Sequence, residues 1–145
     1  MEELVAQLKV ILANTVTMYY KSHVIHWNVI GADFPQYHDF FGDVYEDLFE
    51  AIDPVAEHIR FLGEKVPASL TALQGVASVT DTIDDDADFE SMLTDLQAAN
   101  DATIAALREG ITTADTAGEP AVGNFLQDRL GAHQKLAWKF RSLLA

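Results

Sequence analysis

The sequence contains no cysteine. This excludes disulfide frameworks, thiolate zinc sites, iron–sulfur clusters and cysteine nucleophiles, so any bound metal must be held by imidazole and carboxylate groups. The sequence also has no run of about 18 uncharged apolar residues, and the start Met1-Glu2-Glu3 lacks the basic residues of a secretory signal. We therefore expect a cytoplasmic protein with no membrane partner.

Basic residues are scarce. Nine Lys and Arg side chains stand against 23 Asp and Glu, which gives a formal net charge of -14. A surface of this charge repels phosphate and attracts cations, so strong nucleic-acid binding is not expected. Solubility or adaptation to salt is the simplest alternative explanation for so acidic a composition.

Strand-like alternation is absent as well. Apolar residues recur at helical spacing in four long segments, and Gly and Pro fall mainly between them. The length of 145 residues, with 49% hydrophobic residues, suits one domain over residues 1–145 with a single core. The pattern predicts a bundle of four helices.

The first hairpin turn carries helix-boundary signals. The first helix should stop at Gly31, and Asp33-Phe34-Pro35-Gln36 has the pattern of a capping box, with Asp33 as N-cap and Pro35 in the first turn. A second helix is therefore expected to follow at once, as an antiparallel neighbour, and to end at Gly63.

A long connection over residues 64–86 separates this hairpin from the next. Leu70, Leu73 and Val76 predict one short apolar helix within it. The third helix is expected over about 87–114 and the fourth after Pro120. Short links within hairpins and a long crossover between them are typical of ferritin-like bundles, so we predict an all-α, ferritin-like four-helix bundle. Such a fold does not by itself assign a function.

Candidate metal ligands fall into two groups. His23, His26 and His38 surround the first hairpin turn, and Asp53 and Glu57 lie four residues apart on the second helix. His26 and His38 can meet across the turn, and Asp53 and Glu57 share a helix face on which both can bind one cation. The Glu-x-x-His pairs of most di-iron bundles are missing.

The two groups cannot meet within one chain. His38 and Asp53 are 15 residues apart on one helix, or roughly 22 Å, yet only ~60° apart around it. If two copies pack their second helices antiparallel about a two-fold axis, the histidines of one meet the carboxylates of the other. The spacing predicts an intersubunit metal centre whose donors suit Fe(II), Mn(II) or Zn(II).

The sequence resembles the Dps family, the DNA-binding proteins from starved cells, also called miniferritins. The resemblance covers essentially the whole chain. It is carried by His26-Trp27-Asn28-Val29, Gly31, Phe34, His38, Asp53-x-x-Ala56-Glu57, Ile59-x-x-Leu62-Gly63, Ala132-His133-Gln134-Lys135-Leu136-Ala137-Trp138 and Arg141-Ser142-Leu143-Leu144.

The resemblance implies a hollow dodecamer with ferroxidase centres between two-fold-related subunits. His26 and His38 would come from one chain and Asp53 and Glu57 from its partner. Fe(II) would be oxidised there, preferentially by hydrogen peroxide rather than oxygen, and ferric mineral stored in the cavity as protection against oxidative stress. The family also implicates Trp27 as a nearby electron donor.

Three positions depart from the family pattern. Gly42 stands where many members have an Asp ligand, so one iron site loses a donor, for which Asp39, Asp43 or a water is a possible substitute. Pro54 lies inside the second helix, and Asn124 replaces an Asp associated with the three-fold pore, which puts the usual route of iron uptake in doubt. The family often binds DNA through a Lys-rich tail, and no such segment is present in this sequence.

Several alternatives stay open. Asp53-Pro54 fits the start of a new helix as well as a ligand position. His23 fits either a ligand or an ordinary helical residue, while His58 and His133 are expected on the surface or satisfied in the core. For the whole protein, the alternatives are a cage holding zinc or manganese with lost oxidase activity, and a structural or DNA-compacting assembly.

Overall fold

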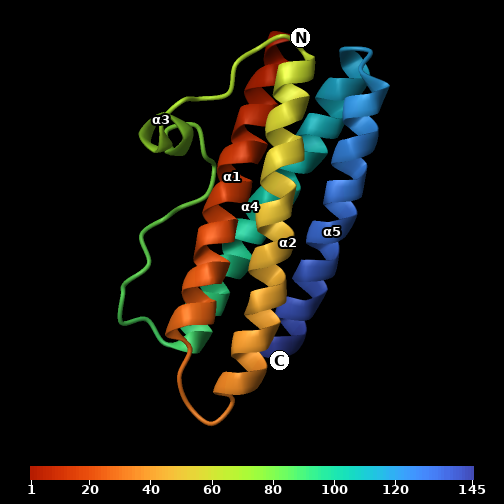
Figure 1. The fold of residues 1–145 in the computed structure, drawn as a ribbon. Coiled ribbons are helices and arrows are strands. Elements are labelled where there is room, and N and C mark those ends of the chain that lie inside the picture. The colour runs from red at the N-terminus through yellow and green to blue at the C-terminus, as the bar shows by residue number, and fades with distance from the viewer.

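The computed structural model describes residues 1–145 and contains helices only. Four long helices form an antiparallel bundle, and a short fifth helix lies in the crossover between the two hairpins (Figure 1). In chain order the elements are α1 (Glu2–Asn28), α2 (Phe34–Phe61), α3 (Leu70–Gln74), α4 (Phe89–Thr116) and α5 (Pro120–Leu144). The predicted all-α, ferritin-like four-helix bundle with its helical crossover is therefore confirmed. No helix is long and apolar enough to span a membrane.

The turn between α1 and α2 lies at the same end of the bundle as the C-terminus (Figure 1). Gly31 turns the chain with φ +112°, a left-handed conformation that favours glycine. The predicted capping box is wrong. Asp33 does precede α2, but its side chain makes no cap hydrogen bond, because ψ of 13° takes it away from the extended conformation of a capping residue. Backbone bonds close the turn instead, from Phe34 N to Gly31 O at 3.1 Å and from Tyr37 N to Asp33 O at 3.1 Å.

Helix α2 runs through Pro54 without interruption. The alternative in which Asp53-Pro54 starts a new helix is therefore wrong. A proline inside a helix costs about 3 kcal/mol, and the fully buried side chains of Val55 and Ile59 on the following turns offset that cost by packing in the core. His58 donates from Nδ1 to the Pro54 carbonyl at 2.7 Å.

The bundle has two apolar cores with a polar layer between them. One core is built around Leu8, Ile11, Ile59, Leu107 and Leu126, and the other around Phe41 and Phe140 with their neighbours. Six polar side chains are buried where the sequence passes from one core to the other; they are Asn14, Thr15, Thr17, Asn100, Thr103 and His133. No buried polar side-chain atom lacks a hydrogen-bond partner, so the layer is satisfied internally.

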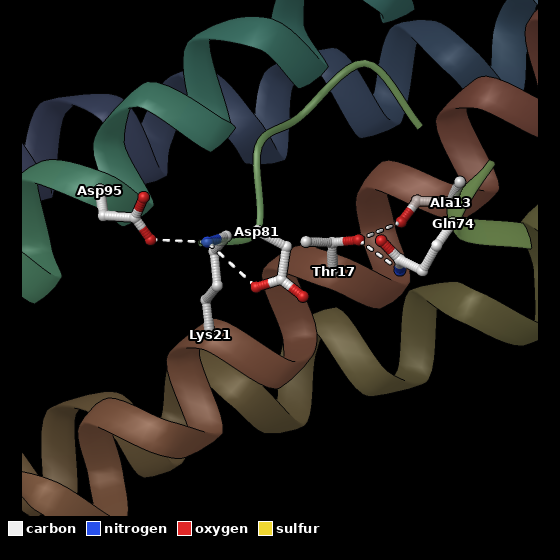
Figure 2. Close-up of polar contacts among 6 residues, drawn as sticks. All are labelled: Ala13, Thr17, Lys21, Gln74, Asp81 and Asp95. Atoms are coloured by element: carbon white, nitrogen blue, oxygen red, sulfur yellow. Dashed lines mark hydrogen bonds and ion pairs between the residues drawn. The ribbon is translucent and has the colours of Figure 1, made fainter. Parts of the chain in front are cut away.

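The crossover is attached to α1 by a buried lysine (Figure 2). The Lys21 side chain is 3% exposed, and its Nζ lies 2.6 Å from Asp95 Oδ2 on α4 and 3.4 Å from Asp81 Oδ1 on the crossover. A buried ammonium is stable only when paired. Lys21 therefore joins α1, α4 and the crossover at one point.

Neutral hydrogen bonds continue this attachment along α1. Thr17 accepts from Gln74 Nε2 at 2.8 Å while its own hydroxyl donates to the Ala13 carbonyl (Figure 2). Asn14 donates to Ser78 Oγ at 2.8 Å and accepts from Ser78 N at 2.9 Å. The crossover follows α1 closely because these side chains recur on one face of that helix.

Candidate metal centre

His26 and His38 face each other across the first hairpin turn. His26 lies in the last turn of α1 and His38 near the start of α2, and their rings stack with centroids 3.7 Å apart at 18°. Nδ1 of His26 donates to the His38 carbonyl at 2.6 Å, and Nδ1 of His38 donates to the His26 carbonyl at 2.7 Å. The structure thus brings together the two histidines that the sequence placed at one site.

These reciprocal bonds fix the tautomer that each ring adopts when it is neutral. A carbonyl oxygen can only accept, so Nδ1 carries the proton of each neutral imidazole and Nε2 has the lone pair. A neutral imidazole oriented by a backbone carbonyl is the form in which histidine binds metals. The pair therefore offers two preoriented nitrogen donors.

Gly42 lies against the His26 ring. A Cβ built on Gly42 would be 3.4 Å from both Cε1 and Nδ1 of His26, which is close contact with the ring edge. Any side chain at this position would therefore touch His26. As it stands, position 42 supplies no donor.

Asp53 and Glu57 are both exposed and lie farther along α2. Neither takes part in an ion pair, since the salt bridges of the chain join only Lys21 to Asp81 and Asp95. Within the protomer no three His, Asp or Glu side chains come close enough to hold a metal ion. Asp53 and Glu57 are thus free to meet groups from outside the protomer.

Carboxylates cover the exposed side of α2. In addition to Asp53 and Glu57, its exposed acidic residues are Asp39, Asp43, Glu46, Asp47 and Glu50. A row of unpaired carboxylates raises the local concentration of cations. The surface leading to the candidate centre therefore favours a divalent cation.

An aromatic group adjoins the histidine pair. Trp27, 54% exposed, stacks on His23 with centroids 3.7 Å apart, and His23 stacks on Tyr45 at 3.8 Å and 6°. The Tyr19 hydroxyl lies 2.9 Å from His23 Nδ1. Burial, and then the proximity of His26, lower the pKa of His23 below its usual value. His23 is thus held by aromatic contacts and a phenol.

Sequence reasoning missed Tyr19 and Tyr45 as neighbours of this site. Tyr19 could have been found, because it precedes His23 by four residues on one helix and therefore shares its face. Tyr45 lies on the opposite helix, and its ring centroid is 5.1 Å from that of His26. Only the packing of α1 against α2 reveals it.

His133 lies far from this site and is fully enclosed. Its Nδ1 donates to Asn100 Oδ1 at 2.8 Å, Asn100 Nδ2 donates back to the His133 carbonyl at 3.0 Å, and Nε2 lies 3.3 Å from Arg129 Nη2. Burial, followed by the charge of Arg129, lowers the pKa of His133 to about 3. The expectation that His133 is satisfied in the core is confirmed.

Comparisons with known proteins agree with this architecture. The sequence profile of the ferritin family, a ferritin-like domain, matches residues 5–145. The DNA protection during starvation protein of Halobacterium salinarum is 34% identical over 129 residues, which cover 89% of this chain and 71% of that protein.

Solved structures of Dps proteins are also similar to this chain. The crystal structure of an archaeal Dps homologue from Halobacterium salinarum has a TM-score of 0.94 and 32% identity, over 99% of this chain and 80% of that one. A Dps protein from Vibrio cholerae, described as a member of a broad superfamily of ferritin-like diiron-carboxylate proteins, has a TM-score of 0.92 and 25% identity, over 99% and 90%.

Proposed function

Since this chain belongs to the Dps family of ferritin-like proteins, we propose that it is an iron-storing miniferritin that oxidises Fe(II) at centres shared between two subunits. Hydrogen peroxide, or oxygen, accepts the electrons, and ferric mineral collects inside a dodecameric cage. The observation that carries the proposal is the His26–His38 pair, whose Nδ1 atoms are both used and whose Nε2 atoms are both free.

The two subunits supply different kinds of ligand to the shared centre. His26 and His38 of one protomer supply neutral nitrogen donors, and Asp53 and Glu57 of the partner subunit supply the negative charge that Fe(II) requires. Support for sharing comes from the exposed, unpaired state of Asp53 and Glu57 and from the absence of a complete donor set in one protomer. The same donors bind zinc or manganese, which would occupy the site without being stored as mineral.

A mixing experiment tests the sharing directly. His38→Ala and Asp53→Ala each remove half of every site, so each variant alone should lose peroxide-driven Fe(II) oxidation. When the two are unfolded, mixed and reassembled, each mixed dimer regains one intact site, and random pairing restores about one quarter of wild-type sites. Ferric absorbance after anaerobic Fe(II) loading and peroxide addition is the measurement.

The controls separate the site from its surroundings. Glu50→Ala removes an exposed carboxylate of the same helix and should keep full activity. No recovery in the mixture, together with normal assembly by native mass spectrometry, would contradict the shared site. A stable monomer would contradict the proposed architecture.

Direct DNA binding is not part of the proposal. The charge of -14 repels phosphate, and no observation in the chain favours the alternative of a DNA-compacting assembly without ferroxidase activity. Retarded migration of duplex DNA at about 0.15 M salt would support that alternative and count against the proposal.

A further inference from the structure

Three large apolar side chains of α2 are exposed in the protomer. They are Phe34, Phe49 and Phe61, with exposed fractions of 39%, 58% and 70%. Helix α2 lies at the front of the bundle in Figure 1, and no other element of the chain passes over its outward face. Single exposed apolar residues are common on protein surfaces, so these rings indicate a contact surface only if their positions are related to each other.

Each of the three rings is held by one ring of its own protomer. The pairs and their centroid distances are Phe34 with His38 at 4.8 Å, Phe49 with Tyr19 at 5.3 Å and Phe61 with His58 at 4.9 Å. A side chain that is already ordered loses little conformational freedom when a partner covers it. The three rings are therefore suited to anchor an interface.

The positions of Phe34 and Phe61 match those of the proposed metal ligands. Phe34 precedes His38 by four residues, and Phe61 follows Glu57 by four residues. When two α2 helices pack antiparallel with His38 opposite the partner's Glu57, Phe34 therefore lies opposite the partner's Phe61. Residues four apart form rows inclined to the helix axis, and two helices that pack along such rows cross obliquely. The rows that carry the ligands thus also carry the aromatic rings.

Phe49 lies close to the two-fold axis of the same arrangement. The midpoint between His38 and Glu57 falls between Asp47 and Leu48, so Phe49 is only about 2 Å along the helix from that axis. At ~100° per residue, Phe49 is about 20° from His38 around the helix. Its exposed ring is therefore on the side of α2 that carries the ligands, where it meets Phe49 of the partner subunit.

Charge disfavours the pairing of two α2 helices. Glu46 and Glu50 flank Phe49, are exposed and form no ion pair. Near a two-fold axis these carboxylates approach the same groups of the partner, and like charges repel each other. Association of the two helices therefore requires an apolar contact strong enough to oppose this repulsion.

We propose that Phe34, Phe49 and Phe61 form the apolar contact through which α2 binds α2 of a second copy of this chain, and that they set its register. This inference rests on the proposed function, because the shared centre defines the register. Phe49 packs on Phe49 of the partner subunit at the axis, and Phe34 packs on the partner's Phe61 at each end. Because Phe34 stacks on His38, the partner's Phe61 covers one side of each centre and shields it from water.

The absence of cysteine allows the axis contact to be mapped with one substitution. Phe49→Cys places two thiols beside the axis, so copper–phenanthroline oxidation of the assembled protein should convert most chains to a disulfide-linked dimer. Asp47→Cys is the matched control, because Asp47 is exposed at the same level of α2 but lines a groove beside α5 with Lys135 and Leu136. This variant should run as a monomer on a denaturing gel without reductant.

A pair of variants tests the two ends. Phe34 and Phe61 are 27 residues apart, or roughly 40 Å along α2. A short bismaleimide should therefore link neither Phe34→Cys nor Phe61→Cys to itself. When the two variants are unfolded, mixed and reassembled, random pairing should give linked products in about half of the dimers.

Substitutions at the axis measure the strength of the contact. Phe49→Asp removes the ring and adds a charge, so the protein concentration at which half of the assembly dissociates should rise at least about tenfold. Phe49→Leu keeps an apolar side chain and should stay within about threefold of the unsubstituted protein. Circular dichroism checks that both variants keep their helices.

The outcomes separate this inference from the proposed function. Recovery of Fe(II) oxidation by the mixed His38 and Asp53 variants, without the expected crosslinks, overturns the inference and leaves the function standing. The expected crosslinks without any ferric iron overturn the function but support the contact. Equal crosslinking of the Asp47 and Phe49 variants overturns the register, and an unchanged dissociation of Phe49→Asp overturns the anchoring role.

Discussion

Two places in this molecule use the ring nitrogens of histidine in opposite ways. At the hairpin turn, the half-buried His26 and His38 each donate from Nδ1 to a backbone carbonyl, and their Nε2 atoms are free. In the polar layer, His133 is 1% exposed, with Nδ1 bound to Asn100 and Nε2 facing Arg129. His26 and His38 therefore leave two ring nitrogens free in one stacked pair, whereas His133 leaves none.

The largest effect that would test this comparison is on stability. His133→Ala removes both ring contacts and leaves Asn100 and Arg129 without their partner in the bundle, which should lower the free energy of unfolding by about 3 kcal/mol. Fe(II) affinity at the hairpin turn should stay within about threefold. Denaturant unfolding and anaerobic Fe(II) titration give the two numbers, and a stability loss below about 1 kcal/mol would show that the layer matters little.

The opposite pattern is expected at the hairpin turn, where a substitution should change Fe(II) affinity strongly and stability little. His38→Ala deletes a proposed ligand, so Fe(II) affinity should fall by about 100-fold, or about 2.7 kcal/mol. The loss of one partly solvated hydrogen bond should cost only about 1 kcal/mol of stability. Unchanged Fe(II) affinity in this variant, measured by the same titration, would remove His38 from the candidate centre.

The pH dependence of stability should report the burial of His133. The folded-state pKa of His133 is about 3, against 6.5 for the free side chain, so below pH 6.5 the unfolded state binds more protons. The contribution of His133 to the free energy of unfolding is therefore fully present above pH 6.5 and is lost as the pH falls toward 3. At pH 5 the loss from this group should be about 2 kcal/mol. The pH dependence of unfolding should be shallower in His133→Gln, and an identical profile would contradict the assignment.

The smallest effect concerns the packing beside His26. Gly42→Ala adds a Cβ that meets the His26 ring at 3.4 Å and replaces a glycine inside a helix, which should raise stability by about 0.5–1 kcal/mol. Fe(II) affinity should change by less than about threefold, because Nε2 of His26 is not the atom contacted. A large loss of affinity would mean that the ring cannot adjust to the added methyl group.

The sequence predicted the helices well because their signals are local. Apolar spacing and the glycines at 31, 63 and 118 mark the helices and their ends, and the structure moves the boundaries by only a few residues. The Asp33 cap failed because a side-chain cap depends on backbone angles that the whole turn sets. The effect of Pro54 was equally hard to foresee, since packing of Val55 and Ile59 outweighs it.

The candidate site was predictable only in part. His26 and His38 lie either side of one turn, so their meeting follows from the chain itself. The bonds of His133 to Asn100 join α5 to α4 across the bundle, and the stack of His23 on Tyr45 joins α1 to α2, so both required the packed structure. The pairing of Asp53 and Glu57 with the histidines of another subunit stays a prediction.

The attachment of the crossover to α1 has a consequence for how this chain tolerates change. Residues 62–88 do not behave as one long loop, because contacts at Gln74, Ser78 and Asp81 divide them into shorter spans. Closure entropy grows slowly with loop length, so residues inserted between Gly63 and Ser69 add little cost. The same residues inserted between Ser78 and Asp81 would shift the Asp81–Lys21 contact out of register with the Ser78–Asn14 contact. Tolerance to insertion should therefore end abruptly where the chain first meets α1.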